Sequence, residues 1–156
     1  MRSLFPQLSD AAFKTMISRA VRAELLVRVC RGVYLYEPAL PKDGLLLYRA
    51  AALLRADRFN YISLETALSD VGVISQIPFN TISLMSSGRS SIIACGRFGS
   101  IEYIHTQQEP KHLMPKITYD HRCGLWRATV PLAIRDMKIT GRNCDLIDWS
   151  VVDEFI

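Results

Sequence analysis

The chain has 156 residues, of which 49% are apolar and 22% charged, and its formal net charge is +4 at pH 7. This length suits one domain or a small module, and the apolar fraction is sufficient for a hydrophobic core. Because no run of about 18 apolar residues occurs and the first residues lack the apolar segment of a secretory signal, we expect a cytoplasmic protein with no membrane partner.

The positive charge is confined to the first quarter of the chain. Residues 1–36 contain six basic and two acidic residues, whereas the remaining 120 residues contain 13 of each. A local cationic field attracts polyanions, of which nucleic acid is the commonest. A solvated basic helix face would carry the same charge, so charge alone leaves both interpretations open.

Helical periodicity is strong after Ser9, and Ser9 is a good N-cap for a helix that starts at Asp10. The apolar residues of this segment fall within one arc at about 100° per residue. The opposite face carries small residues, hydroxyls and cations but no carboxylate, which favours a DNA groove over solvent. The candidate DNA-contacting residues on this face are Lys14, Thr15, Ser18, Arg19 and Arg22.

The next segment predicts a short basic hairpin. We expect strands at Leu26–Cys30 and Val33–Tyr36, joined at Arg31 and Gly32, where glycine can adopt a positive φ. Arg28 and Arg31 are the candidate phosphate contacts. A helix followed by a basic hairpin is typical of the end of a winged helix-turn-helix. Residues 4–8 would form its short second helix or turn, and no first helix is found before them, so the predicted motif is shortened.

The sequence predicts an α+β protein in which the winged helix-turn-helix of residues 1–36 is followed by a mixed α/β domain at residues 37–156. Prolines at 38 and 41 mark the linker. The expected helices cover 45–57, 63–72 with Ser63 as N-cap, a segment that begins near Pro131, and 145–156. The expected strands lie within 80–87, 90–96, 99–107 and 125–129.

Motifs for catalysis or metal binding are not found. The sequence contains no P-loop, no G-x-S-x-G and no H-E-x-x-H. The nearest metal-ligating set is His105, His112, His121 and Cys123, but it lacks the second close pair that a four-ligand zinc site needs. The four cysteines are widely spaced, which indicates buried free thiols rather than disulfides. We therefore predict no enzymatic activity and no cofactor.

The order of several segments resembles the AbiE-type antitoxin family of type IV toxin–antitoxin systems. These segments are "SRAVRAELLVRVCRGVYLY", "DRFNYISLETALSDVGVISQIPFNTISLMSSGR", a β segment ending in "IEYIH", and "WRATVPLAIRDM". The resemblance covers nearly the whole chain, and its most specific parts are the Arg-Gly-Val-Tyr hairpin and "YISLETAL". It implies an N-terminal winged helix-turn-helix that represses its own operon and a C-terminal domain that opposes a nucleotidyltransferase toxin.

Four further residues invite a functional interpretation. Glu65 and Asp136 could be catalytic carboxylates, but the family context favours a structural Glu65 at a helix start, and we expect Asp136 to be an ion-pair partner. We expect Trp126 and Trp149 to anchor the core. An exposed tryptophan would instead be a good hot spot for a protein partner.

Three functions follow from these patterns. The first is an antitoxin and operon repressor, whose partners are a nucleotidyltransferase toxin and operator DNA. One basic helix and wing bury little surface, so we expect two copies, as a homodimer on an inverted repeat. The second is a stand-alone winged-helix regulator without a toxin. The third is a protein-interaction module whose basic face is merely solvated.

Overall fold

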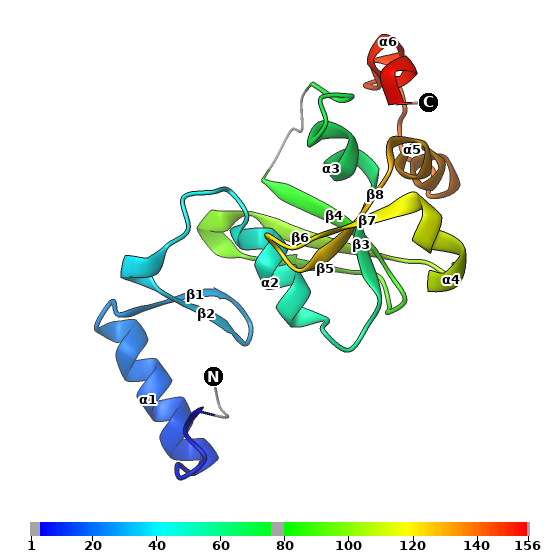
Figure 1. Cartoon of the computed structure of the whole chain (residues 1–156). Helices are drawn as coiled ribbons and strands as arrows, with labels where there is room; N and C mark the ends of the chain where they lie inside the picture. Colours follow the sequence, from blue (N-terminus) through cyan, green and yellow to red (C-terminus); the bar gives the residue numbers. More distant parts are fainter. Residues whose placement is uncertain (1–3, 76–79, 156) are drawn as a thin grey trace.

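The computed structural model describes residues 4–75 and 80–155 and shows an α+β architecture (Figure 1). A helix and a two-stranded hairpin at the N-terminus stand beside a larger unit built on a six-stranded mixed sheet. The predicted fold class is thereby confirmed at the level of α+β. Within the described residues, no helix has the length and apolar character needed to cross a membrane.

The N-terminal unit consists of α1 (Asp10–Arg22), β1 (Leu26–Cys30) and β2 (Val33–Tyr36). Both strands have the predicted bounds, and α1 starts at the predicted residue. The Ser9 hydroxyl accepts a hydrogen bond from the backbone N–H of Ala12 at 3.2 Å and so caps α1 as expected. The two strands are antiparallel, with a bulge between Arg28 and Cys30, and Gly32 has a φ of +83° in the turn. Residues 4–8 form turns rather than an α-helix, so the described part of this unit contains one helix.

The sheet has the strand order β5-β6-β4-β3-β8-β7. Its strands are β3 (Asn60–Ile62), β4 (Thr81–Ser86), β5 (Ser91–Ala94), β6 (Ser100–His105), β7 (Ile117–Asp120) and β8 (Leu125–Ala128). The pairs β4–β6 and β3–β8 are parallel, and the other neighbours are antiparallel. The carboxyl ends of β4 and β6 therefore lie at the same edge, and the loop of residues 87–90 crosses the end of β6 to reach β5.

One glycine is fixed by this topology. Gly99 ends the turn that leads from β5 to β6, and its φ is +113°. A Cβ atom at this position would lie 1.8 Å from the backbone oxygen of Asn80. Glycine is required here both for the backbone conformation and for the close approach to the chain before β4.

Helices cover both faces of the sheet (Figure 1). α2 (Leu46–Leu54) lies on one face, and α3 (Leu64–Ser69) and α5 (Val130–Ile139) pack together on the other. Pro131 lies in the first turn of α5, as predicted. The shorter helices are α4 (Pro110–Leu113), α6 (Trp149–Val152) and the 3₁₀ segments Glu37–Ala39, Gly96–Phe98, Met114–Lys116 and Asp153–Phe155.

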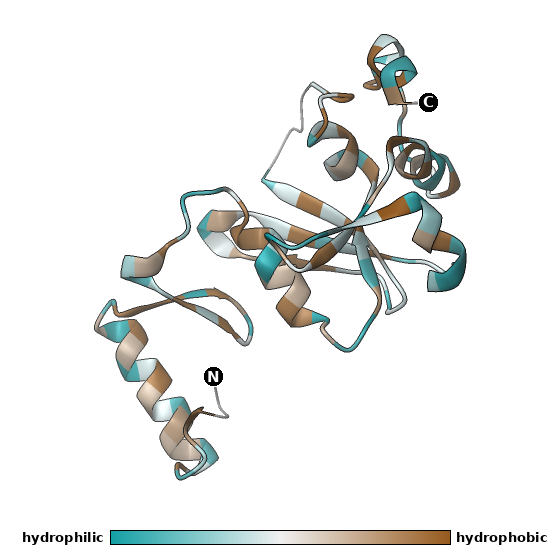
Figure 2. Ribbon diagram, in the orientation of Figure 1, coloured by the Kyte–Doolittle hydropathy of each residue, from teal (hydrophilic) through white to brown (hydrophobic). Residues whose placement is uncertain are grey.

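The N-terminal hairpin and the sheet share one hydrophobic core. Val29 and Cys30 of β1 are 2% and 5% exposed and belong to the same buried cluster as Cys95 and the central strands. Figure 2 shows apolar residues concentrated along those strands. Arg97 also binds Glu37 at 3.0 Å, which connects the chain after β2 to the turn between β5 and β6. The described part of the N-terminal unit is therefore packed against the larger one.

Several helices are shorter than the sequence predicts. α2 ends at Leu54 rather than near residue 57, and Leu53 near its end is 69% exposed. The predicted helix of 145–156 reduces to α6 and one 3₁₀ turn. α4 and β7 were not predicted, because residues 108–124 contain polar residues and two prolines without a clear period.

Candidate nucleic-acid interface and polar clusters

The residues predicted to contact DNA are all solvent-exposed. Five of them lie along α1, one lies on β1 and one lies in the hairpin turn. They are Lys14, Thr15, Ser18, Arg19, Arg22, Arg28 and Arg31. The basic residues Arg19 and Arg22 lie in the last turn of α1, where the helix dipole favours cations. The helix thus presents a cationic face next to a cationic turn.

The cations of this surface differ from most arginines elsewhere in the chain. In residues 4–75 and 80–155, none of Lys14, Arg19, Arg22, Arg28 and Arg31 forms an ion pair. Outside this unit most arginines are paired, namely Arg49, Arg58, Arg97, Arg122, Arg127 and Arg142. Unpaired cations keep their charge available to an external anion.

Arg28 has a different setting from the other candidates. It lines a hollow of about 640 Å³ between the N-terminal unit and the β5–β6 turn. Glu24, Glu37 and Arg97 line the same hollow. A phosphate there would meet two carboxylates, so the geometry makes Arg28 the weakest of the seven candidates.

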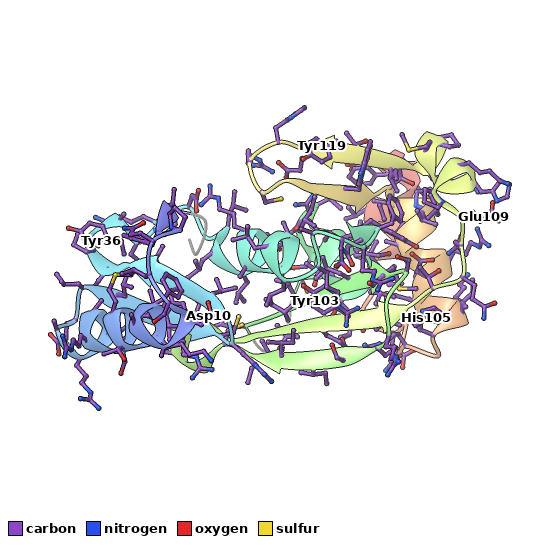
Figure 3. The ribbon with its side chains drawn as sticks, turned by 90° about the horizontal axis from the view of Figure 1, so that it is seen from below. Asp10, Tyr36, Tyr103, His105, Glu109 and Tyr119 are labelled. Carbon is purple, nitrogen blue, oxygen red and sulfur yellow. The ribbon has the colours of Figure 1, made fainter. Side chains whose placement is uncertain are left out.

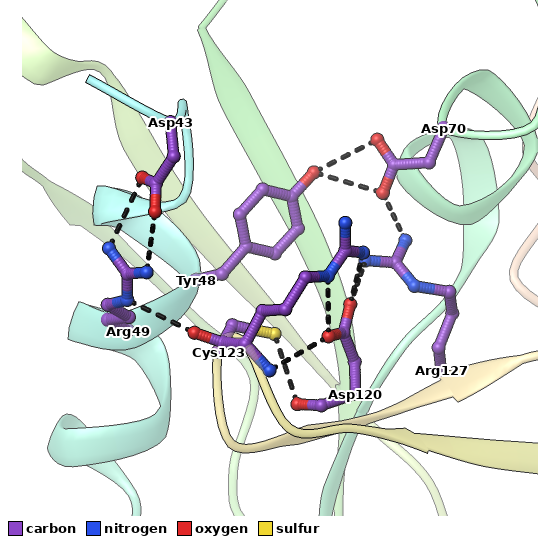
Figure 4. Close-up of polar contacts among 8 residues, drawn as sticks. Asp43, Tyr48, Arg49, Asp70, Asp120, Cys123 and Arg127 are labelled. Carbon is purple, nitrogen blue, oxygen red and sulfur yellow. Dashed lines mark hydrogen bonds and ion pairs between the residues drawn. The ribbon is translucent and has the colours of Figure 1, made fainter. Parts of the chain in front are cut away.

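In a second group of charged residues, arginines and aspartates pair with one another (Figure 4). Arg127 on β8 contacts Asp70 and lies 3.3 Å from Asp120, and the Tyr48 hydroxyl donates to Asp70 at 3.1 Å. Arg122 binds Asp120 at 2.7 Å and holds the pKa of that carboxyl well below its usual range. Three guanidinium and three carboxylate groups meet here, since Arg49 binds Asp43 at 2.6 Å. The cluster joins α2, α3 and the β7–β8 hairpin and has a structural role.

Asp136 lies fully buried in α5 and is hydrogen-bonded rather than ion-paired. Its carboxylate accepts hydrogen bonds from Ser63 at 2.7 Å, Tyr61 at 2.9 Å and Gln108 at 3.1 Å, and no described residue forms an ion pair with it. The expected ion-pair role is therefore wrong. Ser63 is the N-cap residue of α3, as predicted, but its hydroxyl donates to Asp136 and makes no capping hydrogen bond to the helix. The next residue, Leu64, has a left-handed φ of +57°.

Burial raises the pKa of Asp136, and the hydrogen bonds from Ser63, Tyr61 and Gln108 only partly oppose this effect. A carboxyl with a raised folded-state pKa contributes stability that is fully present below its unfolded-state value of about 3.9 and is lost as the pH rises through the folded-state value. We expect Asp136→Asn to remove this loss. Its free energy of unfolding should rise relative to that of the wild type between pH 4 and pH 7, by about 1.4 kcal/mol for each pH unit by which the pKa is raised. Urea unfolding at several pH values checks this, and parallel pH profiles would contradict it.

Glu65, unlike Asp136, does form an ion pair. Its carboxylate lies 3.6 Å from Arg142, which also binds Glu102 at 2.6 Å. Ser83 donates to the same Glu102 at 3.0 Å. Glu65 Oε2 is buried without a hydrogen-bond partner among the described residues. Glu65 lies at the start of α3, as predicted, and is paired there with Arg142.

The cysteines, histidines and tryptophans give a mixed result. All four cysteines are free, and Cys30, Cys95 and Cys123 are buried, as predicted, while Cys144 is half-buried. The three histidines are exposed, and in the described part of the chain no three His, Cys, Asp or Glu residues are grouped so that they could hold a metal ion. Trp126 packs against the core, but Trp149 is 51% exposed, so its predicted role as a core anchor is wrong.

A cationic cavity of about 630 Å³ lies at the edge where β4 and β6 end. It is lined by Arg55, Asp57, Arg58, Ser87, Gly88, Arg89, Ser90 and His105. In the sequence, the Ser-Gly-Arg-Ser stretch at residues 87–90 carries only a turn signal. Its connection to Arg55 and His105 depends on the strand order, which no local signal in the sequence reveals.

Comparison with known protein families, with curated proteins and with solved structures finds no match to this chain.

Proposed function

We propose that the protein is an antitoxin that represses its own operon by binding DNA and opposes a nucleotidyltransferase toxin. In this proposal α1 lies in the major groove, and the β1–β2 hairpin acts as the wing of a shortened winged helix-turn-helix. Two copies bind an inverted repeat. The observation that carries the DNA-binding part is the exposed cationic face of α1 and Arg31, whose cations have no ion-pair partner in the described chain.

The toxin-opposing part of the proposal lies in residues 37–156. The support is the exposed aromatic and apolar side chains near the C-terminus: Leu146 is 53%, Trp149 51% and Phe155 44% exposed. The Trp149 ring lies 5.7 Å from the Lys138 ammonium, so it is held beside α5. Exposed tryptophan is enriched among the residues that dominate protein–protein binding. This surface is the one that we assign to the toxin.

Salt dependence tests the DNA-binding part. We expect the full chain to bind duplex DNA from upstream of its own reading frame, with about four to six neutralised phosphates. The slope of log affinity against log salt concentration should then be near −4 to −5, because each neutralised phosphate releases condensed counterions. Fluorescence anisotropy titrations at four salt concentrations measure this slope. A slope near zero would favour the third function, a protein-interaction module with a solvated basic face.

The stand-alone regulator is the second candidate. It shares the DNA-binding prediction but has no toxin. A neighbouring reading frame for a nucleotidyltransferase, together with rescue of growth when both proteins are expressed, distinguishes the antitoxin from it. Because Val29 and Cys30 belong to the shared core, these experiments should use the full chain rather than a fragment without residues 1–36.

A further inference from the structure

We propose that the cavity at the carboxyl ends of β4 and β6 binds the phosphate group of a small ligand. Three arginines, two serines and one histidine line it, against one carboxylate, Asp57. Ligands of α/β sheets often bind outside the carboxyl ends of parallel strands, and this edge has that geometry. This site is separate from the proposed DNA-binding function and does not depend on it.

Hydrogen bonds from Arg55 hold the loop of residues 87–90 in place over the end of β6. Arg55 donates to the Ser86 hydroxyl at 3.0 Å, to the Arg89 carbonyl at 2.6 Å and to the Ser91 hydroxyl at 2.8 Å. Its guanidinium carbon also lies 3.9 Å from the centre of the Tyr103 ring. Arg55 therefore holds residues 87–90 across the end of β6. A loop held in this way is preorganised, so a ligand does not need to order it.

Several donors of the loop remain available for an oxyanion. In the part of the chain that the structure describes, the backbone N–H groups of Arg89 and Ser90 donate no hydrogen bond. The Ser87 and Ser90 oxygens accept from the backbone N–H groups of Phe59 and His105, which leaves both hydroxyl protons free to donate. Neighbouring backbone N–H groups are a common element of anion sites.

The side-chain charges complete the site. Arg58 and Arg89 are both exposed at the cavity, and among the described residues Arg89 has no ion pair. Arg58 lies 3.3 Å from Asp57, an exposed pair of the kind that contributes little. Arginine forms bidentate, charge-assisted hydrogen bonds with phosphate. The lining contains no phenylalanine, tyrosine or tryptophan on which a base would stack, so we assign the site to the phosphate rather than to a base.

This cavity is remote from the cationic face of α1. Figure 3 shows His105 toward one end of the molecule and Tyr36 toward the other, with Asp10 on the Tyr36 side. A single straight duplex contact centred on α1 would therefore not explain the cations around His105. The two cationic surfaces call for two different anions.

Nuclear magnetic resonance of the full chain tests the proposal. We expect the amide signals of Arg89 and Ser90 to shift saturably with inorganic phosphate and with 5′-AMP, but not with adenosine or with sodium chloride at equal ionic strength. Arg89→Ala should weaken phosphate binding about tenfold, because it removes a charge-assisted hydrogen bond. Asp57→Asn should strengthen binding about threefold, because it removes the one carboxylate. Lys42→Ala removes an exposed cation that does not line the cavity; it is the matched control and should leave binding unchanged.

Three results would overturn the proposal. The first is a shift with sodium chloride as large as that with phosphate. The second is an equal loss of binding in Lys42→Ala and Arg89→Ala, which would indicate general ionic attraction. The third is a response to duplex DNA without any response to 5′-AMP, which would assign the cavity to the nucleic-acid surface. Both side chains are exposed, and circular dichroism of each variant verifies that it is folded.

Discussion

Replacing Lys14, Arg19 and Arg22 together with alanine is expected to weaken duplex DNA binding by on the order of 100-fold at about 100 mM salt. The three side chains are exposed on one helix and have no ion-pair partner within the described residues. Each substitution therefore removes one contact to a phosphate or to a base. The salt slope should become shallower by about three, because about three fewer counterions are released. Alanine is a strong helix former, so α1 should persist. Anisotropy titrations of the variant and the wild type measure both quantities.

A matched variant distinguishes an effect of the α1 surface from an effect of the net charge of the protein. Lys42, Lys116 and Arg135 are exposed cations of the neutral remainder of the chain, and their replacement by alanine removes the same charge. This control should bind DNA within about threefold of the wild type. If both triple variants lose the same affinity, binding follows the overall charge, and α1 is not the reading element.

Arg127→Ala is expected to lower the free energy of unfolding by about 2–3 kcal/mol. The Arg127 side chain is only 18% exposed and serves both Asp70 and Asp120, so its removal leaves two partly buried carboxylates without that partner. Tyr48 would then donate to a carboxylate that has lost its cation. Urea unfolding at pH 7 measures the change, and the m-value should remain the same if the native state is intact.

The control for this experiment is Arg58→Ala. Arg58 lies 3.3 Å from Asp57, but its side chain is 55% exposed and that of Asp57 is 74% exposed. Such a pair contributes little, and the change should stay within about 0.5 kcal/mol. A loss for Arg127→Ala as small as this would mean that the cluster in Figure 4 does not contribute to stability.

Local signals were sufficient for the N-terminal unit and for most strands. The cap at Ser9, the apolar arc of the residues that follow it and the turn at Gly32 act over a few residues. α1 therefore starts at the predicted residue, and β1 and β2 have the predicted bounds. The strand–Pro131–helix segment was recognised for the same reason. The exposure of the seven candidate residues also followed from helical and turn geometry.

Long-range partners could not be predicted in this way. The partners of Asp136 come from β3, the start of α3 and residue 108, so its role depends on the assembled sheet. Arg127 and Asp70 are 57 residues apart, and no sequence period connects them. Trp149 was expected to be buried because tryptophan usually is, but the short α6 leaves it exposed.

The strand order has a consequence for the route by which the chain folds. β6 lies between β4 and β5, although β5 precedes it in the chain, so the chain must pass to the edge of the sheet and turn back at Gly99 before β6 can pair with β4. The β5–β6 hairpin is a local contact that can form in microseconds, whereas β4–β6 pairing also closes the loop between them. We therefore infer that the hairpin forms first and docks onto β4 as a preformed pair, and that this docking closes the cationic cavity over the end of β6 late in folding.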